Sequence, residues 1–102
     1  MTLSLATRQQ VFDAIDTERE YQKAKWGEPN HEIDAFVAYI VGYANELVKV
    51  ASHTDNVDQR LAFIRKVTTL GVAAMEQHGA PKRTEAEMEA ARNFNQLQPV
   101  AV

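Results

Sequence analysis

The chain contains no cysteine and only three histidines among its 102 residues. The lack of cysteine excludes disulfides, thiolate metal ligands, iron–sulfur clusters and cysteine nucleophiles within these residues. His31, His53 and His78 stand at unrelated spacings, so they form no zinc-binding motif and fit positions near helix ends better. The sequence also lacks the P-loop, GxGxxG and GxSxG patterns. Thiol, zinc and hydrolase-triad chemistry are therefore not expected.

An excess of positive charge and a long apolar run are also missing. The formal net charge is −3, whereas proteins that bind nucleic acid in general usually carry a basic excess. The longest apolar-rich stretch, residues 36–51, holds too many polar residues for a membrane span. Residues 1–6 have neither the basic segment nor the apolar run of a targeting signal. These features predict a cytoplasmic protein that binds neither membranes nor nucleic acid in general.

Helix-breaking residues are few, with four glycines and three prolines. Two glycines are each followed two residues later by a proline, at residues 27–29 and 79–81, which is typical of a helix end. Thr7 with Gln10, and Thr84 with Glu87, form capping-box patterns that predict helix starts. Apolar residues at helical spacing then predict an all-α fold of three long helices and one short helix, at residues 7–26, 31–52, 57–78 and 84–95.

A single domain accounts for the chain, with residues 1–95 as the helical domain and residues 96–102 as a flexible tail. The helix expected at 31–52 has an apolar face so wide that we expect it to be buried on two sides. The short helix at 84–95 has few apolar residues. We therefore expect it to dock on a surface of its own chain or of a neighbouring one.

Two segments are similar to a known family. Residues 15–27, IDTEREYQKAKWG, contain the pattern ER-x-x-Q…KWG, and residues 64–83, IRKVTTLGVAAMEQHGAPKR, contain an alanine-rich helix end. With the apolar helix between them, they resemble the MazG-like all-α nucleoside triphosphate pyrophosphohydrolase superfamily, most closely its small phage and prophage branch. The likeness covers residues 12–83, and its KWG segment is the more specific marker. The resemblance implies a helical bundle that forms homo-oligomers.

The carboxylates on which that family's chemistry depends are missing from the matching positions. Active members resemble one another in an EExxE pattern on the second helix and an ExxD pattern on the third, which hold Mg²⁺ against the substrate phosphates. Here Val41, Gly42 and Asn45 occupy the first pattern, with only Glu46 acidic beside them. Residues 65–69, RKVTT, hold no carboxylate. The resemblance therefore implies a nucleotide-sized pocket without the metal site, and we expect no cofactor.

The third predicted helix carries cations and hydroxyls where the family has carboxylates, and such groups can bind phosphate without a bridging metal. We therefore predict a non-catalytic nucleotide-binding protein, such as a phage sponge that sequesters a nucleotide immune signal in a pocket at a subunit interface. Aromatic side chains would stack on the base, and cationic ones would neutralise the phosphates. The predicted ligand-binding residues are Arg19, Tyr21, Lys25, Trp26, Arg65, Lys66 and Thr69, with Tyr43 as a further stacking candidate.

Two other functions stay open on the sequence. The first is a Mg²⁺-dependent pyrophosphohydrolase with a rearranged site, for which Glu18 and Glu46 are weak candidate ligands. Further carboxylates available to it are Asp13, Asp16 and Glu76. The second is a helical protein–protein interaction module, which the short capped helix and the tail would fit. In either case Arg65 and Lys66 would lie at the edge of the core, and Trp26 would cover a helix end.

Overall fold

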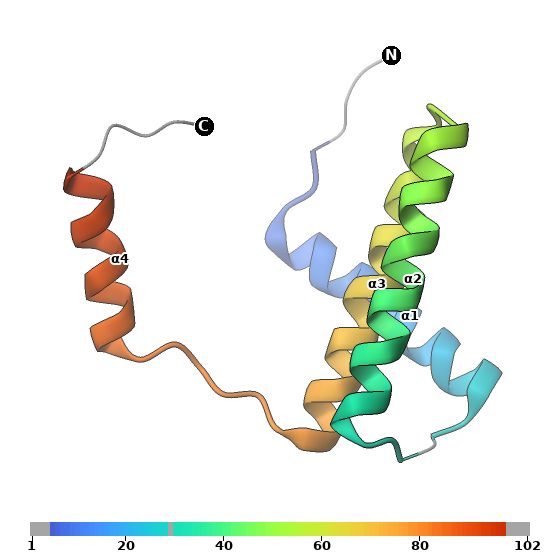
Figure 1. Ribbon diagram of the computed structural model, residues 1–102, viewed down its shortest axis with the longest axis horizontal. Helices are drawn as coiled ribbons and strands as arrows, with labels where there is room; N and C mark the ends of the chain where they lie inside the picture. Colours follow the sequence, from blue (N-terminus) through green and yellow to red (C-terminus); the bar gives the residue numbers. More distant parts are fainter. Residues whose placement is uncertain (1–4, 29, 98–102) are drawn as a thin grey trace.

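The computed structural model describes residues 5–28 and 30–97. These residues form α1 (Arg8–Trp26), α2 (Ile33–His53), α3 (Val57–His78) and α4 (Glu85–Leu97), which are shown in Figure 1. Within the described ranges there is no strand, so the all-α prediction is confirmed. The residue before Asn30 and most of the predicted tail, residues 98–102, lie outside the described part.

Hydrogen bonds between side chains and nearby backbone amides mark where α1 and α4 begin. At α1 the hydroxyl of Thr7 accepts a hydrogen bond from the Gln10 amide at 3.1 Å, and the Gln10 side chain accepts one from the Thr7 amide at 2.8 Å. Thr84 and Glu87 make the same reciprocal pair before α4, with both bonds at 3.1 Å. Each pair satisfies two amides that the first helical turn leaves free. Both predicted capping boxes are confirmed.

The predicted helix ends at residues 27 and 79 are confirmed as well. Gly27 and Gly79 adopt φ angles of 76° and 118°, which side chains with a Cβ rarely accept. Their amides donate to the carbonyls of Lys23 and Met75, both at 2.8 Å, and so close the last turns of α1 and α3. The chain can therefore leave each helix in a new direction at these two glycines.

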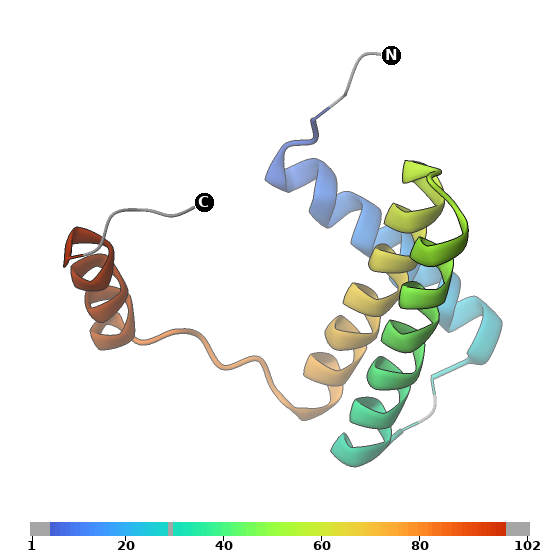
Figure 2. The same cartoon turned by 45° about the horizontal axis from the view of Figure 1, so that its top comes forward.

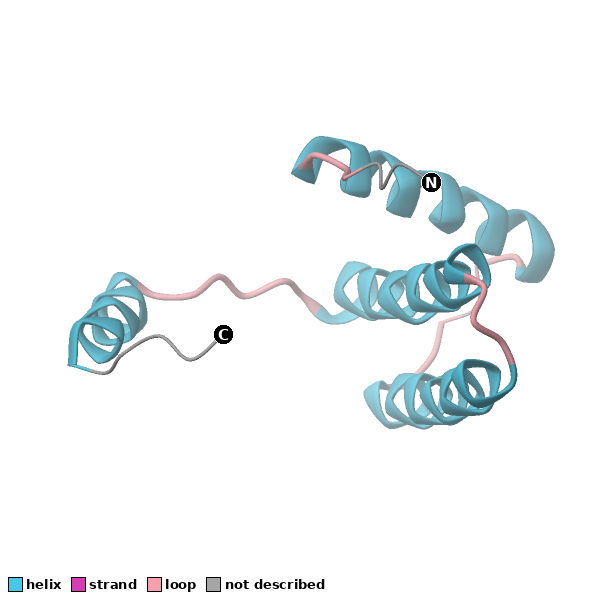
Figure 3. Ribbon diagram, turned by 90° about the horizontal axis from the view of Figure 1, so that it is seen from above, coloured by secondary structure: helices cyan, strands magenta, loops and turns pink. Residues whose placement is uncertain are grey.

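α3 lies in the middle of the fold. It packs against α2 on one side and against α1 on the other, whereas the described residues of α1 and α2 make no backbone approach to each other. Figure 3 shows this order from above, with α1 and α2 on different sides of α3. The short connection at residues 54–56 makes α2 and α3 an antiparallel pair, which Figure 2 shows side by side. The three helices form an open arrangement, in which only α3 has a neighbour on both sides.

The apolar core is correspondingly small. Its buried members in the described part of the chain are Phe36, Leu70 and Ala73. The ring of Phe36 makes edge-to-face contacts with His31 and His78, with centroids 5.5 and 6.0 Å apart. These three rings join the start of α2 to the end of α3.

The prediction that the second helix is buried on two sides is wrong for the single chain. Along α2, Val37, Val41 and Val48 keep 53%, 54% and 65% of their surface exposed. The reason is the position of α1, which packs on α3 and leaves one side of α2 uncovered. The sequence pattern shows how wide the apolar face is, but not which part of it receives a neighbour.

The short helix α4 stands apart from the other three. Residues 79–84 form an extended connection that carries it away from the end of α3 (Figures 1 and 3). None of its described residues approaches α1, α2 or α3. The expected docking of this helix is therefore not found on its own chain. No described helix is long and apolar enough to cross a membrane.

The small core makes its members unusually important for stability. We expect Phe36→Ala to lower the free energy of unfolding by about 3 kcal/mol, because it removes a buried ring and leaves a cavity between α2 and α3. Urea denaturation followed by circular dichroism measures this loss. The control is Leu5→Ala at a side chain that is 92% exposed, and its effect should stay within about 0.5 kcal/mol. Equal effects of the two substitutions would contradict the assignment of the core.

Candidate functional site

Two cavities lie next to each other along α3, and both include Trp26. The first, which we call the aromatic cavity, has a volume of about 270 Å³ and opens between α1 and α2 over α3. The second, which we call the cationic cavity, has a volume of about 320 Å³ and lies between α1 and α3. Trp26 lines both cavities. Because it is 41% exposed, it is still accessible to solvent.

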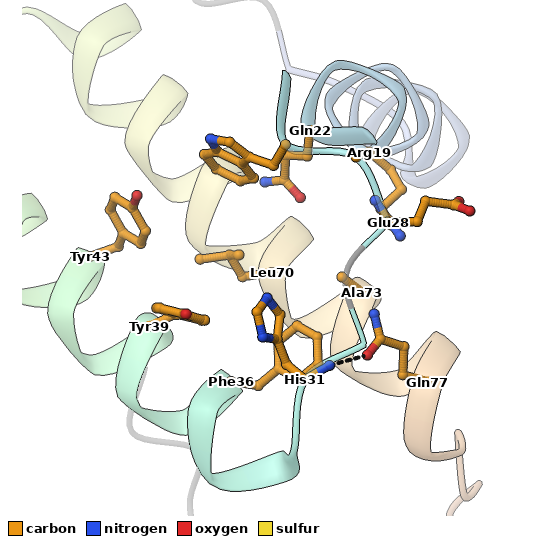
Figure 4. A pocket seen from close by; sticks show the side chains of 12 residues that line it. Arg19, Gln22, Glu28, His31, Phe36, Tyr39, Tyr43, Leu70, Ala73 and Gln77 are labelled. Atoms are coloured by element: carbon orange, nitrogen blue, oxygen red, sulfur yellow. Dashed lines mark hydrogen bonds between the residues drawn. The ribbon is translucent and has the colours of Figure 1, made fainter. Parts of the chain in front are cut away.

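The walls of the aromatic cavity come from α1, α2, α3 and the loop between α1 and α2, and its aromatic wall comes from one side of α2. Phe36, Tyr39 and Tyr43 follow one another at helical spacing, and the buried Leu70 and Ala73 of α3 form the floor. Figure 4 shows Tyr39 and Tyr43 facing the cavity from α2, opposite Gln22 and Arg19 of α1. Neither Phe36 nor Tyr39 was predicted to bind a ligand. Their spacing with Tyr43 is the signal that would have grouped the three.

The loop between α1 and α2 closes one end of the aromatic cavity. The His31 amide donates to the Gln77 side chain at 3.0 Å, as Figure 4 shows, and the His31 carbonyl lies 2.7 Å from His78 Nε2. The His31 ring also meets Tyr39 edge to face, with centroids 5.2 Å apart. These contacts with both α2 and α3 fix the loop in place, so the cavity has a built end rather than an open one.

The cationic cavity contains basic side chains from the two segments that resemble the MazG-like family. It is lined by three basic side chains and one acidic side chain, together with aromatic and small residues. Its members are Glu18, Tyr21, Lys25, Trp26, Ala62, Phe63, Arg65 and Lys66. The local charge is therefore positive in a chain whose net charge is −3.

The two lysines of this cavity rest on aromatic rings. Lys66 Nζ lies 4.1 Å from the centre of the Tyr43 ring, and Lys25 Nζ lies 5.7 Å from that of Tyr21 and 5.8 Å from that of Trp26. A ring face attracts a cation but leaves its net charge in place. In the described part of the chain neither ammonium group forms an ion pair with a carboxylate. Both charges are thus free to meet an anion.

The two arginines differ from the lysines, because each is paired with a carboxylate. Arg65 Nε donates to Glu18 at 2.8 Å, while 46% of the Arg65 side chain stays exposed. Arg19 binds Glu76 through Nε at 3.1 Å and through a terminal nitrogen at 3.0 Å, and only 11% of its side chain is exposed. Arg65 therefore keeps part of its guanidinium accessible, whereas Arg19 serves mainly to hold α1 against α3.

The contact between α1 and α3 places these side chains. Gln22 is 3% exposed and its amide nitrogen lies 3.5 Å from the Lys66 carbonyl. Since Lys25 and Trp26 follow one turn later on the same helix, this contact sets their distance from α3. Lys66 lines the cationic cavity, and its ammonium group lies over the ring of Tyr43, which lines the aromatic cavity. This contact joins the two cavities.

The structure brings together five of the seven predicted ligand-binding residues. Those five line the cationic cavity: Tyr21, Lys25, Trp26, Arg65 and Lys66. Arg19 lies instead at the aromatic cavity. Thr69 lines neither cavity and is fully buried, with its hydroxyl donating to the Arg65 carbonyl at 2.7 Å. The burial of Thr69 was not predicted, because the sequence does not show which sides of the third helix other helices cover.

The carboxylates proposed for a rearranged magnesium site lie apart from one another. Glu18 and Glu76 are bound by arginines, and Glu46 pairs with Lys49 at 3.2 Å on α2, outside both cavities. Among residues 5–28 and 30–97, no three histidine or acidic side chains come together in a way that could hold a metal ion. The groups that converge at the cavities are instead cations and aromatic rings.

Comparison with known proteins finds no matching family model, no matching curated protein and no matching solved structure. The resemblance to MazG-like proteins therefore stays a prediction from the two sequence segments.

The pKa of Glu28, at the rim of the aromatic cavity, provides a test of the loop geometry. Lys23 Nζ lies 2.9 Å from its carboxylate, and this hydrogen bond, with the attraction between the charges, lowers the pKa of Glu28 below its usual 4.5. A carbon-detected NMR titration should find that lowered pKa. The contact is present at neutral pH and is lost as the pH falls through the lowered pKa.

Replacing Lys23 isolates the cause of this shift. In Lys23→Met the pKa of Glu28 should return toward 4.5, whereas that of Glu87, which is lowered by Thr84 and Arg83, should stay as it is. An unchanged Glu28 pKa in the variant would show that Lys23 does not hold the loop.

Proposed function

We propose that this chain is a non-catalytic nucleotide-binding protein with a MazG-like helical fold. The observation that carries the proposal is the pairing of an aromatic cavity with a cationic cavity at one shared residue, Trp26. A nucleotide has the same two parts, a flat apolar base and an anionic phosphate chain. One ligand could therefore occupy both cavities, with its sugar beside Trp26.

The aromatic cavity fits the base. Its rings come from α2 and from the end of α1, and a base between Tyr39 or Tyr43 and Trp26 would replace exposed ring surface with stacking contacts. Stacking of a base on a protein ring contributes on the order of 1–3 kcal/mol. Gln22 and Arg19 line the α1 side of the cavity, where their packing against α3 holds that wall in place.

The cationic cavity fits the phosphates. Lys25 and Lys66 offer ammonium groups that no described carboxylate neutralises, and Arg65 adds a guanidinium that can bind two oxygens at once. With Glu18 counted against the three cations, the lining has a net charge of +2, which offsets part of the charge of a di- or triphosphate without a metal ion. This is why we propose binding without a magnesium cofactor and without hydrolysis.

A protein of this kind acts by withdrawing its ligand from other proteins. If the chain comes from a phage, as the sequence resemblance suggests, its role would be that of a cytoplasmic sponge for a nucleotide signal of host immunity. Tight sequestration favours a homo-oligomer, since a second subunit would cover the open side of Trp26. This biological role rests on the binding proposal and extends it.

Trp26 is the single tryptophan of the chain, so its fluorescence reports on both cavities. We expect ATP, GTP or a cyclic dinucleotide, each titrated in the presence of EDTA, to change this fluorescence to saturation and to raise the melting temperature. Arg65→Glu should weaken binding by about tenfold or more, because it replaces a phosphate ligand with a carboxylate. Circular dichroism should confirm that the variant stays helical.

The matched control is Arg8→Glu, which makes the same charge change at the exposed start of α1, away from both cavities. Its affinity should equal that of the parent chain. Binding that fails for all three nucleotides would contradict the proposal. Binding that needs Mg²⁺ and releases pyrophosphate would replace it with a pyrophosphohydrolase.

A second substitution tests whether Glu18 competes with the phosphates for Arg65. Glu18→Gln removes the negative charge that now binds Arg65 Nε at 2.8 Å, so affinity for the nucleotide should rise severalfold. The control is Glu20→Gln, two positions along α1, where the carboxylate lines neither cavity and the affinity should change little. Isothermal titration calorimetry of both variants decides the matter. Equal affinities would argue against Arg65 as a phosphate ligand.

A further inference from the structure

The chain exposes far more surface than a single folded protein of its size. Its accessible surface is 8433 Å², whereas a compact monomer of 11.5 kDa exposes about 5,800 Å². Its radius of gyration is 16.8 Å, against about 13 Å for a compact domain of this length. If two copies buried this excess of about 2,600 Å² each, the total of about 5,200 Å² would lie at the upper end of obligate homodimer interfaces. Part of the excess comes from α4 and its extended connection, since α4 approaches none of the other three helices in the described part of the chain.

Part of this excess is an apolar ridge on α2, which we call the α2 ridge. It consists of Ile33, Val37, Val41 and Val48, each more than half exposed at 57%, 53%, 54% and 65%. Their spacing places them on one side of the helix, next to the side that faces α3 and away from Tyr39. From Ile33 to Val48 the ridge is about 22 Å long.

The helix α4 has a complementary face and no partner of its own. Ala86, Ala90 and Phe94 recur every four residues and form an apolar row, with Phe94 58% exposed. Its polar side is tied together by Arg92, which binds Glu85 at 2.8 Å and Glu89 at 2.7 Å. With its capping box formed, α4 is a finished amphipathic helix of 13 residues, about 20 Å long. That length matches the α2 ridge.

We propose that α4 of one copy docks on the α2 ridge of a second copy, and that the second copy returns the same contact. Ile33, Val37 and Val41, like Ala86, Ala90 and Phe94, follow the i, i+4 spacing, so these two rows can interlock as ridges into grooves. Ala86 and Ala90 allow the two helix axes to approach closely, and Phe94 would then lie between the valines of the ridge. A reciprocal exchange of this kind closes as a twofold dimer and leaves no unpaired ridge.

Two observations favour a second copy over the chain's own α2. The connection at residues 79–84 runs outward from α3, with Ala80 before Pro81 biased toward an extended backbone, and leaves α4 without a contact on its own chain. In addition, a helix of 13 residues folding back would cover only the ridge, and apolar side chains elsewhere would stay exposed. Those on α1 and α3 include Phe12, Leu61 and Ile64. A second chain can cover both regions.

The absence of cysteine makes a disulfide test straightforward. Chains with Val41→Cys are mixed with size-tagged chains with Ala90→Cys under mild oxidation. We expect the disulfide-linked hetero-pair to form at least tenfold more than in the matched control, in which Glu89→Cys, on the polar side of α4 with Arg92, replaces Ala90→Cys. Yields no higher than the control would overturn the proposal.

The double variant Val41→Cys/Ala90→Cys distinguishes a second copy from the chain's own α2. On non-reducing gels we expect bands at twice the chain mass of 11.5 kDa, whereas bridges confined to single chains would show that α4 folds back and would overturn the proposal. Light scattering provides the second measurement. The parent chain should have twice the chain mass and Phe94→Glu the chain mass, and a parent of 11.5 kDa at every concentration would equally overturn it. These tests need no nucleotide, so they are independent of the proposed function.

Discussion

The contact between α1 and α3 determines the rest of the structure, because within residues 5–28 and 30–97 the backbone of α1 approaches no other helix. Gln22 of α1 is buried there, with its amide nitrogen 3.5 Å from the Lys66 carbonyl of α3. Two ion pairs of opposite polarity also join the helices, Glu18 to Arg65 and Arg19 to Glu76. A slip of α1 along α3 would break these polar contacts. They therefore help to set the register of α1 and with it the position of Trp26.

This way of holding α1 explains the charge of the cationic cavity. Glu18 and Glu76 are used by the two arginines, so no acidic side chain lies near enough to pair with Lys25 or Lys66 among the described residues. The two ammonium groups rest on rings, which hold them in position without cancelling their charge. Acidic residues elsewhere make the net charge −3, but they do not screen this region closely. The proposed anion site thus follows from how the helices are joined.

The sequence predicted those features that depend on neighbouring residues. Thr7 with Gln10, and Gly27 after Trp26, control helix ends through bonds within one turn, and these bounds were correct. Burial depends on which helices meet, and there the prediction failed in two ways. Thr69 was predicted to bind a ligand but is fully buried, and α2 was predicted to be buried on two sides although, in the described part of the chain, only the backbone of α3 approaches it. The sequence also predicted that one site contains Tyr21, Lys25, Trp26, Arg65 and Lys66, because these residues lie in the two segments that resemble one family. Their convergence depends on the same polar contact.

The aromatic cavity and the exposed ridge of α2 have a common origin. In a closed bundle of three helices each helix meets both others, and side chains fill the space between them. Here α2 meets only α3 and keeps two uncovered sides, one with Tyr39 and Tyr43 toward α1 and one with Val37 and Val41 away from it. Closing the bundle would cover more apolar surface but would fill the cavity with side chains. A fold that keeps the cavity open leaves its other side to be covered by different means, and the helix that we propose is supplied by another chain would do so without entering the cavity.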